Sequence, residues 1–198
     1  MNQEEVRCKL LNGTIQVIAR EGLDRASTKQ IGKEASVNEA YIYRCFADKE
    51  DMFQKAFVQI VNELVELVLK NSGIMYDRTL IFPVRCRQYF DVVWNFFVDN
   101  REKCLTYVRY YYSPYFAKYA AEDYKKRFMP VVAFLQPAFK EEADVWMILN
   151  HIFNVILDFA VKVHYDQMPR DESYTEHVFR VIYVSVIQYF KESEGKDL

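Results

Sequence analysis

Three signals for the start of a helix follow one another closely near the N-terminus. Ser27 is followed three residues later by Gln30, which fits a capping box in which each side chain bonds the other residue's backbone N–H. Asn38 and Asp48 are residues whose side-chain oxygens cap helix N-termini. Only residues 35–37 separate the first two helices, so a tight turn must join them. Two short helices joined in this way form a helix-turn-helix.

The apolar residues of this region fall on the face that should point inward. They are Ile31, Ala35, Val37, Ile42 and Phe46. In a DNA-binding helix-turn-helix the second helix, here residues 38–45, lies in the major groove. The alternative is an ordinary helical hairpin that serves only for packing, and the spacing alone does not separate these two interpretations.

Four short motifs occur in order in the same region. They are Glu21-Gly22, Thr28-Lys29-Gln30-Ile31-Gly32, Tyr43-Arg44-Cys45-Phe46 and Lys49-Glu50-Asp51-Met52-Phe53. Together they resemble the N-terminal signature of the TetR family of bacterial repressors. The resemblance covers roughly residues 6–57, and the remainder is similar only in length and helical character. It implies a repressor that binds a palindromic double-stranded DNA operator as a homodimer and is released by a small molecule.

Three positions depart from the family pattern. Ser36 stands where the turn usually has Gly, and Gly32 stands where the first helix of the motif usually has Ala. Tyr41 replaces a residue that is usually Ser or Thr. The first two departures concern local stability, and the third concerns which operator is read.

Composition favours an all-α fold of about nine helices. The chain has 198 residues, 51% of them hydrophobic, and five Gly and five Pro are too few for a turn-rich β fold. We expect a helix-turn-helix DNA-binding domain at residues 1–50 and a helical regulatory and dimerisation domain at residues 51–198. Residues 1–50 contain eight basic and eight acidic residues, which counts against tight non-specific DNA binding.

The spacing of apolar residues predicts the other helices. The expected ranges are 4–21, 48–71, 82–98, 102–112, 115–139, 141–165 and 171–191. The 48–71 helix would connect the two domains, and the 115–139 segment should be kinked or split at Pro130. The last two helices should form a four-helix dimer interface through their surplus apolar residues. Those residues are Trp146, Ile152, Val155, Phe159, Phe179, Ile182, Val186 and Phe190.

The DNA contacts follow partly from position and partly from the resemblance. Thr28, Tyr43 and Lys49 are the expected phosphate contacts by family resemblance, and helix N-termini suit phosphate oxygens. The expected base contacts are Glu39, Ala40 and Tyr41, assisted by Lys29 or Arg44. An alternative for Glu39 is a solvated acid that stabilises the start of a helix.

A ligand pocket is expected in the C-terminal part, mainly on the family resemblance. Tyr residues are dense between positions 107 and 119, and His151, Asn154 and Asp158 share one face of an otherwise apolar helix. The predicted ligand contacts are Trp94, Tyr107, Tyr111, Asn154 and Asp158, and the effector should be aromatic or apolar. The alternative is a core whose polar groups satisfy one another's hydrogen bonds.

Other classes of function find little support in the sequence. The three histidines form no metal-binding or catalytic motif, and the four cysteines are scattered, so we expect no enzyme, metal or cofactor. No apolar run has the length of a membrane span, and no signal segment begins the chain, which favours the cytoplasm. The competing function is a helical DNA-binding or adaptor protein without a small-molecule effector.

Overall fold

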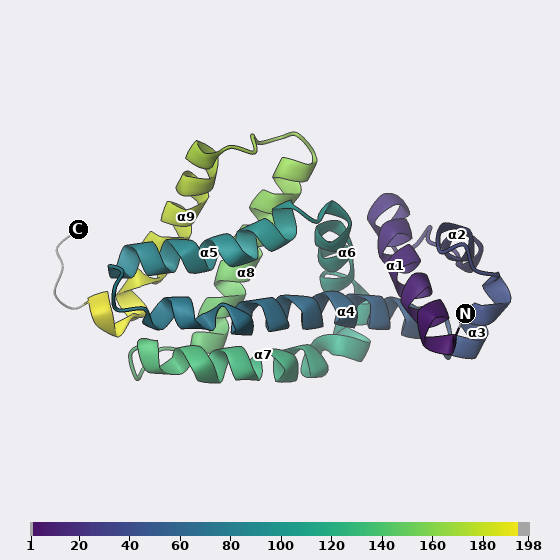
Figure 1. The fold of residues 1–198 in the computed structure, drawn as a ribbon, viewed down its shortest axis with the longest axis horizontal. Helices are drawn as coiled ribbons and strands as arrows, with labels where there is room; N and C mark the ends of the chain where they lie inside the picture. Colours follow the sequence, from purple (N-terminus) through teal and green to yellow (C-terminus); the bar gives the residue numbers. More distant parts are fainter. Residues whose placement is uncertain (1, 194–198) are drawn as a thin grey trace. The chain divides into compact units, whose positions relative to one another are not determined.

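The computed structural model describes residues 2–193, and within them the regular elements are helical (Figure 1). The α-helices are α1 Gln3–Glu21, α2 Thr28–Glu34, α3 Ile42–Cys45, α4 Lys49–Lys70, α5 Phe82–Val98, α6 Arg101–Tyr111, α7 Ala121–Leu135, α8 Val145–His164 and α9 Glu172–Val186. Extended pairing in this described part is an isolated antiparallel bridge between Phe139 and Phe190. The prediction of an all-α fold with about nine helices is confirmed.

The chain divides into two compact units, and the division does not follow the boundary expected at residue 50. The N-terminal unit comprises Met1–Glu63 and Asn100–Lys126, and the C-terminal unit comprises Leu64–Asp99 and Arg127–Leu198. Helices α4 and α7 therefore each contribute residues to both units.

The N-terminal unit is built around α1, which packs against α2 and α6. Two threonine hydroxyls are satisfied inside this packing, since Thr14 Oγ1 donates to the Leu10 carbonyl and Thr106 Oγ1 to the Ile15 carbonyl, each at 2.7 Å. Gly13 faces Ala35, and a Cβ at Gly13 would lie 3.1 Å from the Cβ of Ala35. Gly13 therefore allows a close approach of α1 to the end of α2.

The C-terminal unit is built around α8, which packs against α5 and α9. By length and composition α8 is the one helix among the described residues that could cross a membrane. Its apolar residues pack on α5 and α9, while His151, Asn154 and Asp158 lie on its exposed side. That two-sided pattern is typical of a helix at the edge of a protein core.

Three predicted ranges differ from the structure. The chain is not split at Pro130, because α7 continues through it, and the irregular part is instead a π-helical turn at Phe116–Ala120. Helix α8 begins only at Val145, capped by Asp144. Helix α9 ends at Val186, and a 3-10 turn at Ile187–Tyr189 leads into the bridge at Phe190. The helix expected over 171–191 is therefore a regular α-helix only from Glu172 to Val186.

Candidate DNA-binding site and effector cavity

The first helix of the helix-turn-helix begins as the capping-box signal predicts. The Ser27 backbone N–H donates to Gln30 Oε1 at 2.9 Å, and the Gln30 backbone N–H donates to Ser27 Oγ at 3.3 Å. These two bonds satisfy backbone donors that a helix N-terminus otherwise leaves unpaired. Helix α2 then runs from Thr28 to Glu34.

The turn that follows is tighter than a side chain at residue 32 would allow. The Val37 N–H donates to the Gly32 carbonyl at 2.9 Å, and a Cβ at Gly32 would lie 2.9 Å from the Val37 carbonyl oxygen. Ser36 has a φ of 54°, in the left-handed region that favours glycine. Two of the three departures from the family pattern thus shape this turn: Ser36 lies in it, and Gly32, within α2, makes the close approach possible.

The second helix of the motif is short and begins as a 3-10 turn. Asn38 Oδ1 accepts from the Ala40 N–H at 2.9 Å, which confirms Asn38 as the cap. The 3-10 turn at Glu39–Tyr41 leads into α3, so the helix expected over 38–45 is regular only in its second half. The predicted inward-facing residues are all buried: Ile31, Ala35, Val37, Ile42 and Phe46.

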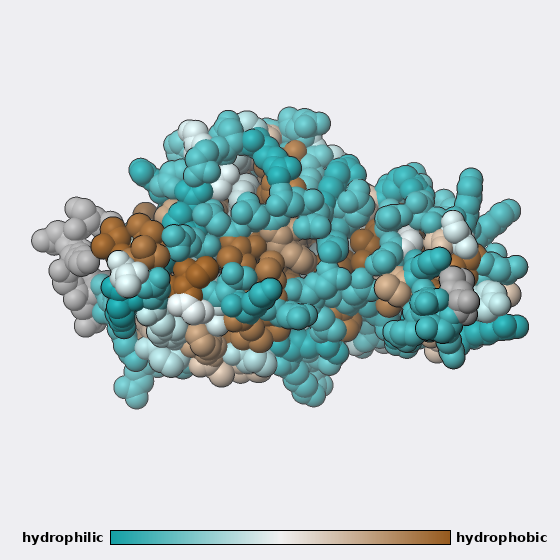
Figure 2. Space-filling view, viewed as in Figure 1, coloured by the Kyte–Doolittle hydropathy of each residue, from teal (hydrophilic) through white to brown (hydrophobic). Residues whose placement is uncertain are grey.

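The polar residues predicted to contact DNA lie on the surface of this motif. Lys29, Ala40, Tyr41, Tyr43 and Arg44 are exposed, while Thr28, Glu39 and Lys49 are half-buried. On the face shown in Figure 2, hydrophilic side chains cover most of the region of α2 and α3. Their contacts with DNA remain predictions.

Two of these side chains are held by aromatic neighbours. The Arg44 guanidinium lies over the Tyr41 ring at 4.9 Å, and Lys49 Nζ lies over the Phe53 ring at 5.4 Å. A cation over an aromatic face is attracted to the ring's electron-rich face. Both charges are thus held in place at the surface before any ligand binds.

Glu39 has a partner within the protein. The Thr28 hydroxyl donates to the Glu39 carboxylate across the two helices of the motif. An acceptor bound in this way has less capacity for a cytosine amino group, and its charge opposes a phosphate at Thr28. The geometry therefore favours a structural role for Glu39 over base recognition.

Helix α4 begins beside the motif with two interlocking caps. Asp48 Oδ1 accepts from the Asp51 N–H at 2.7 Å, and Asp51 Oδ2 accepts from the Ala47 N–H at 3.0 Å. Burial acts to raise the pKa of Asp51, but hydrogen bonds from Lys55 and Ala47 outweigh it and hold this pKa below its ordinary value. The predicted cap at Asp48 is confirmed.

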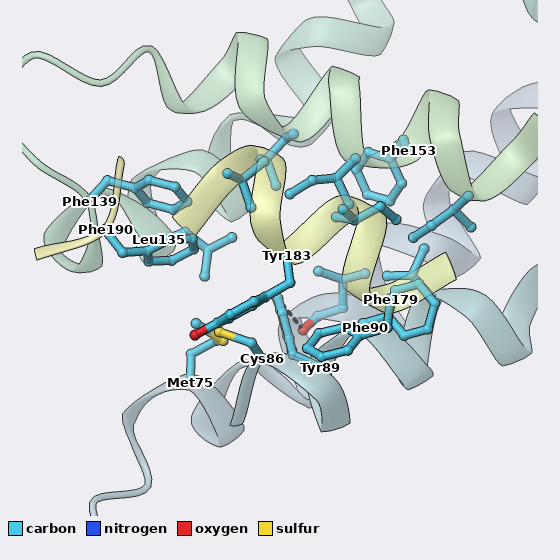
Figure 3. Close-up of a pocket in the computed structure, with 17 residues that line it drawn as sticks. Met75, Cys86, Tyr89, Phe90, Leu135, Phe139, Phe153, Phe179, Tyr183 and Phe190 are labelled. Carbon is cyan, nitrogen blue, oxygen red and sulfur yellow. Dashed lines mark hydrogen bonds between the residues drawn. The ribbon is translucent and has the colours of Figure 1, made fainter. Parts of the chain in front are cut away.

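An apolar cavity of about 80 Å³ lies within the C-terminal unit (Figure 3). Its lining comes from α4, α5, α7, α8, α9 and the segments between them: Val68, Met75, Cys86, Tyr89, Phe90, Val93, Leu135, Phe139, Leu149, Ile152, Phe153, Ile156, Phe179, Ile182, Tyr183, Val186 and Phe190. Figure 3 shows Leu135, Phe139 and Phe190 at one end and Phe90 and Phe179 towards the other. Such a lining suits an apolar ligand.

The few polar groups of the lining, such as the Tyr89 hydroxyl and the Cys86 thiol, are uncharged. The Tyr89 hydroxyl donates to the Val68 carbonyl at 3.4 Å, and burial raises the pKa of Tyr89 above its ordinary value. Burial also raises the pKa of the Cys86 thiol to about 12, so this thiol is protonated at neutral pH. The lining itself therefore carries no formal charge.

The residues predicted to bind the effector do not form this lining. Asp158 is exposed on α8, with 58% of its side chain accessible, and pairs with Lys162 at 2.5 Å. Asn154 is exposed too, and His151 Nε2 lies 3.0 Å from Ser185 Oγ. The prediction that this polar stripe faces a pocket is wrong in geometry, because the opposite side of α8 faces the core.

Of the three predicted aromatic contacts, Trp94 and Tyr107 are buried core residues and Tyr111 is half-buried. Trp94 is buried and stacks on Phe90, which does line the cavity, with ring centroids 5.8 Å apart. Tyr107 and Tyr111 belong to the N-terminal unit, where the Tyr107 hydroxyl lies 2.6 Å from that of Tyr124. Their rings form an aromatic cluster around Phe57.

Comparison with known proteins assigns the helix-turn-helix region to a family. The family profile described as bacterial regulatory proteins, tetR family, matches residues 10–56, which span α1, the helix-turn-helix and the start of α4. Over these residues the chain is similar to regulators of the TetR family.

Two curated TetR-type relatives match only part of the chain. The nicotine-responsive transcriptional repressor HdnoR of Paenarthrobacter nicotinovorans is 32% identical over 62 residues, which are 31% of this chain and 32% of HdnoR. An uncharacterised HTH-type transcriptional regulator of Haemophilus influenzae is 26% identical over 92 residues, 46% of this chain and 47% of that protein. The chain thus matches less than half the length of either relative.

Solved TetR-family structures share the fold over nearly the whole chain. A regulator from Marinobacter aquaeolei has a TM-score of 0.74 at 14% identity, covering 92% of this chain and 95% of its own. FadR from Bacillus subtilis, solved with stearoyl-CoA, has a TM-score of 0.70 at 17% identity, covering 88% of this chain and 96% of its own. At these identities the likeness concerns the fold alone.

The cavity is the feature of the C-terminal unit that sequence reasoning missed. Its lining residues lie at helical spacing on apolar faces, which is also the pattern of a solid core. One signal was available: Arg85 is a cation within the apolar 82–98 helix, and it is only 3% exposed. A buried charge requires a partner, and such a requirement indicates a specific arrangement nearby.

Proposed function

We propose that this chain is a transcriptional repressor that binds a palindromic operator as a homodimer and releases it when a small molecule binds. The observation that carries the proposal is the helix-turn-helix, whose apolar residues are buried while Tyr43 and Arg44 stand on its outer surface. An ordinary packing hairpin would have no reason to expose these side chains together. The site of action is the cytoplasm, and no catalytic activity is part of the proposal.

The phosphate contacts are assigned to residues that flank the recognition helix. Thr28 lies at the N-terminus of α2, and Lys49 lies at the N-terminus of α4, where free backbone N–H groups favour anions. Tyr43, which is 63% exposed, adds a hydroxyl between them. Base contacts fall to Ala40 and Tyr41, with Lys29 and Arg44 beside them.

The dimer is assigned to the exposed apolar residues of α8 and α9. A single short recognition helix provides too few contacts for specific affinity, whereas two-fold dimers read half-sites about 34–36 Å apart. Met147, Val181 and Val184 are 58%, 57% and 62% exposed. They replace four of the residues first expected in the interface, because Phe179, Ile182, Val186 and Phe190 are buried within the C-terminal unit.

The effector is assigned to the apolar cavity of the C-terminal unit. The name of HdnoR describes it as nicotine-responsive, and FadR was solved with stearoyl-CoA, so two relatives respond to or bind molecules with apolar parts. The aromatic and aliphatic lining of this cavity supports an apolar effector for this chain as well.

Helices α4 and α7 provide a covalent route between effector and DNA, because each is continuous and contributes to both units. Release by a hundredfold requires about 2.7 kcal/mol of differential effector affinity between the two conformations. The effector must bind the DNA-incompetent conformation better, since equal affinity for both conformations shifts nothing.

Selection from a randomised double-stranded DNA library tests the proposal. The purified chain should enrich a palindrome whose half-sites are spaced by about one helical turn, 10–10.5 base pairs. Sedimentation should show a dimer at micromolar concentration, alone and on the selected DNA. A monomer, or a library without an enriched palindrome, would contradict the regulator and favour a helical adaptor.

A further inference from the structure

Residues Tyr189–Glu192, here termed the C-terminal strap, contribute Phe190 to one wall of the cavity. The Lys140 N–H donates to the Tyr189 carbonyl at 2.8 Å, and Lys191 Nζ donates to the Pro137 carbonyl at 3.0 Å. The Phe190 ring lines the cavity and lies with its centroid 4.1 Å from that of Phe139. The two hydrogen bonds join the strap to residues 137–140.

A buried cation lies beside this wall. Arg85 is 3% exposed, and its Nη1 donates to the carbonyl of Met75, a lining residue, at 2.7 Å. Its guanidinium lies over the Phe82 ring at 5.2 Å, and Phe82 in turn packs on Phe190 with centroids 5.0 Å apart. Arg85 thus adjoins the end of the cavity that the strap closes.

The carboxylate that neutralises Arg85 comes from the strap itself. Arg85 Nη2 donates to Glu192 Oε2 at 2.5 Å, while the other oxygen, Oε1, accepts from Arg78 Nη1. Because Glu192 divides its two oxygens between two arginines, it meets Arg85 through one bond only. Arg85 Nε is buried without a hydrogen-bond partner among the described residues.

A guanidinium binds a carboxylate best through two parallel N–H bonds to its two oxygens. Arg85 Nε and Nη2 are two neighbouring donors that could bind a carboxylate in this way. Glu192 accepts a hydrogen bond from Nη2 only. Buried donors without a partner are rare and costly, so this pair of donors favours a carboxylate that can accept both bonds.

The size of the cavity indicates which wall must move. An apolar cavity of about 150 Å³ accommodates benzene, and the cavity here measures about 80 Å³. A ligand larger than a single ring therefore requires a displaced wall. Five long helices line the cavity, whereas the strap is a short segment outside these helices whose large ring, Phe190, lies in the lining.

We propose that the effector is a hydrophobic carboxylate, whose head group replaces Glu192 on Arg85 and whose apolar tail occupies the space that Phe190 fills. This inference rests on the proposed regulator function and names the chemical class of its effector. A neutral ligand that displaced the strap would leave a buried guanidinium without a counter-charge, which is strongly unfavourable. A cationic ligand would in addition be repelled by Arg85.

Calorimetric titration with octanoate and 1-octanol, in the absence of DNA, tests the head group, because the two share a chain of eight carbons. The wild-type protein should bind octanoate at least about tenfold more tightly, which corresponds to one added hydrogen bond between charged groups. Equal affinity for the two compounds, or binding of neither, would overturn the inference.

Two variants separate the roles of the strap and the cation. Glu192→Gln removes the competing carboxylate, so octanoate affinity should rise by about tenfold, whereas Glu141→Gln, an equal charge change at an exposed residue of the same unit, should leave it unchanged. Arg85→Met should reduce the octanoate preference to about one. If that variant fails to fold, Glu192→Gln alone decides, and an unchanged affinity refutes the exchange of carboxylates.

The operator chosen by selection completes the test. Octanoate should weaken operator binding and 1-octanol should not. If no operator is enriched, the proposed function fails, while the titrations still report on the carboxylate site. If the operator binds and octanoate neither binds nor releases it, only this inference fails.

Discussion

Gly32→Ala is the substitution for which the structure makes the least intuitive prediction. Alanine is the residue usual at this position in the family, and Ala stabilises a helix interior by about 1 kcal/mol relative to Gly. Here, however, the added Cβ would lie 2.9 Å from the Val37 carbonyl oxygen, and 3.3 Å and 3.4 Å from the Glu39 backbone N and Cα. All three atoms belong to the backbone, which cannot rotate away as a side chain could.

The magnitude follows from two opposing contributions. Adding a methylene to a filled site costs about 1–3 kcal/mol, which exceeds the gain in helix propensity. We therefore expect a net loss of about 1 kcal/mol, equivalent to a fall in Tm of about 2–4 °C for a chain of this length. Because the atoms displaced lead directly into the recognition segment, operator affinity should fall as well.

Thermal unfolding by circular dichroism and an operator titration check both effects. Gly73→Ala is the matched control, since a Cβ there meets nothing within 4 Å, and it should leave Tm and operator affinity unchanged. A Gly32→Ala variant that melts at or above the wild-type temperature and binds the operator normally would refute the reasoning from close approach.

Four further substitutions test the DNA interface and the core. Lys49→Ala and Tyr43→Phe should weaken binding to all sequences, and Lys49→Ala should flatten the salt dependence by about one unit; an unchanged slope in a salt titration would contradict the docking. Glu39→Gln should tighten binding by about 1 kcal/mol in an operator titration, because it removes a charge near the expected phosphates; weaker binding with a lost base preference would support base recognition. Tyr110→Phe removes a buried hydroxyl that has no hydrogen-bond partner among the described residues, so Tm should rise by about 2–4 °C, and a fall would indicate a bound partner.

The helix-turn-helix could be predicted from the sequence because its determinants are local. A capping box joins residues three apart, and the buried set from Ile31 to Phe46 follows from helical spacing and one tight turn. For the conformation of the turn, the sequence offered only the two departures from the family pattern at Gly32 and Ser36. Its close contact became clear from the positions of Val37 and Glu39.

The effector site could not be predicted because its determinants are distant in the sequence. The cavity lining combines residues from Val68 to Phe190, and nothing in the spacing along one helix shows that several helices leave a space between them. The polar stripe of α8, by contrast, was misread although its determinant is local. Asp158 and Lys162, four residues apart, satisfy each other at the surface, a pairing that the sequence did contain.

The neutral charge of the first fifty residues has an explanation in where each charge lies. Several of the acids have partners within the protein: Glu5 caps α1 by accepting from the Asn2 N–H at 3.0 Å, and Glu34 pairs with Arg20 at 3.0 Å. Among the described residues, Lys29 and Arg44 form no ion pair with a carboxylate. The net charge of zero over these residues is therefore compatible with DNA binding, because Lys29 and Arg44 can contact phosphates while acids such as Glu5 and Glu34 have partners within the protein. Affinity for DNA should then depend on a few placed contacts rather than on a general positive field, which favours specific over non-specific binding.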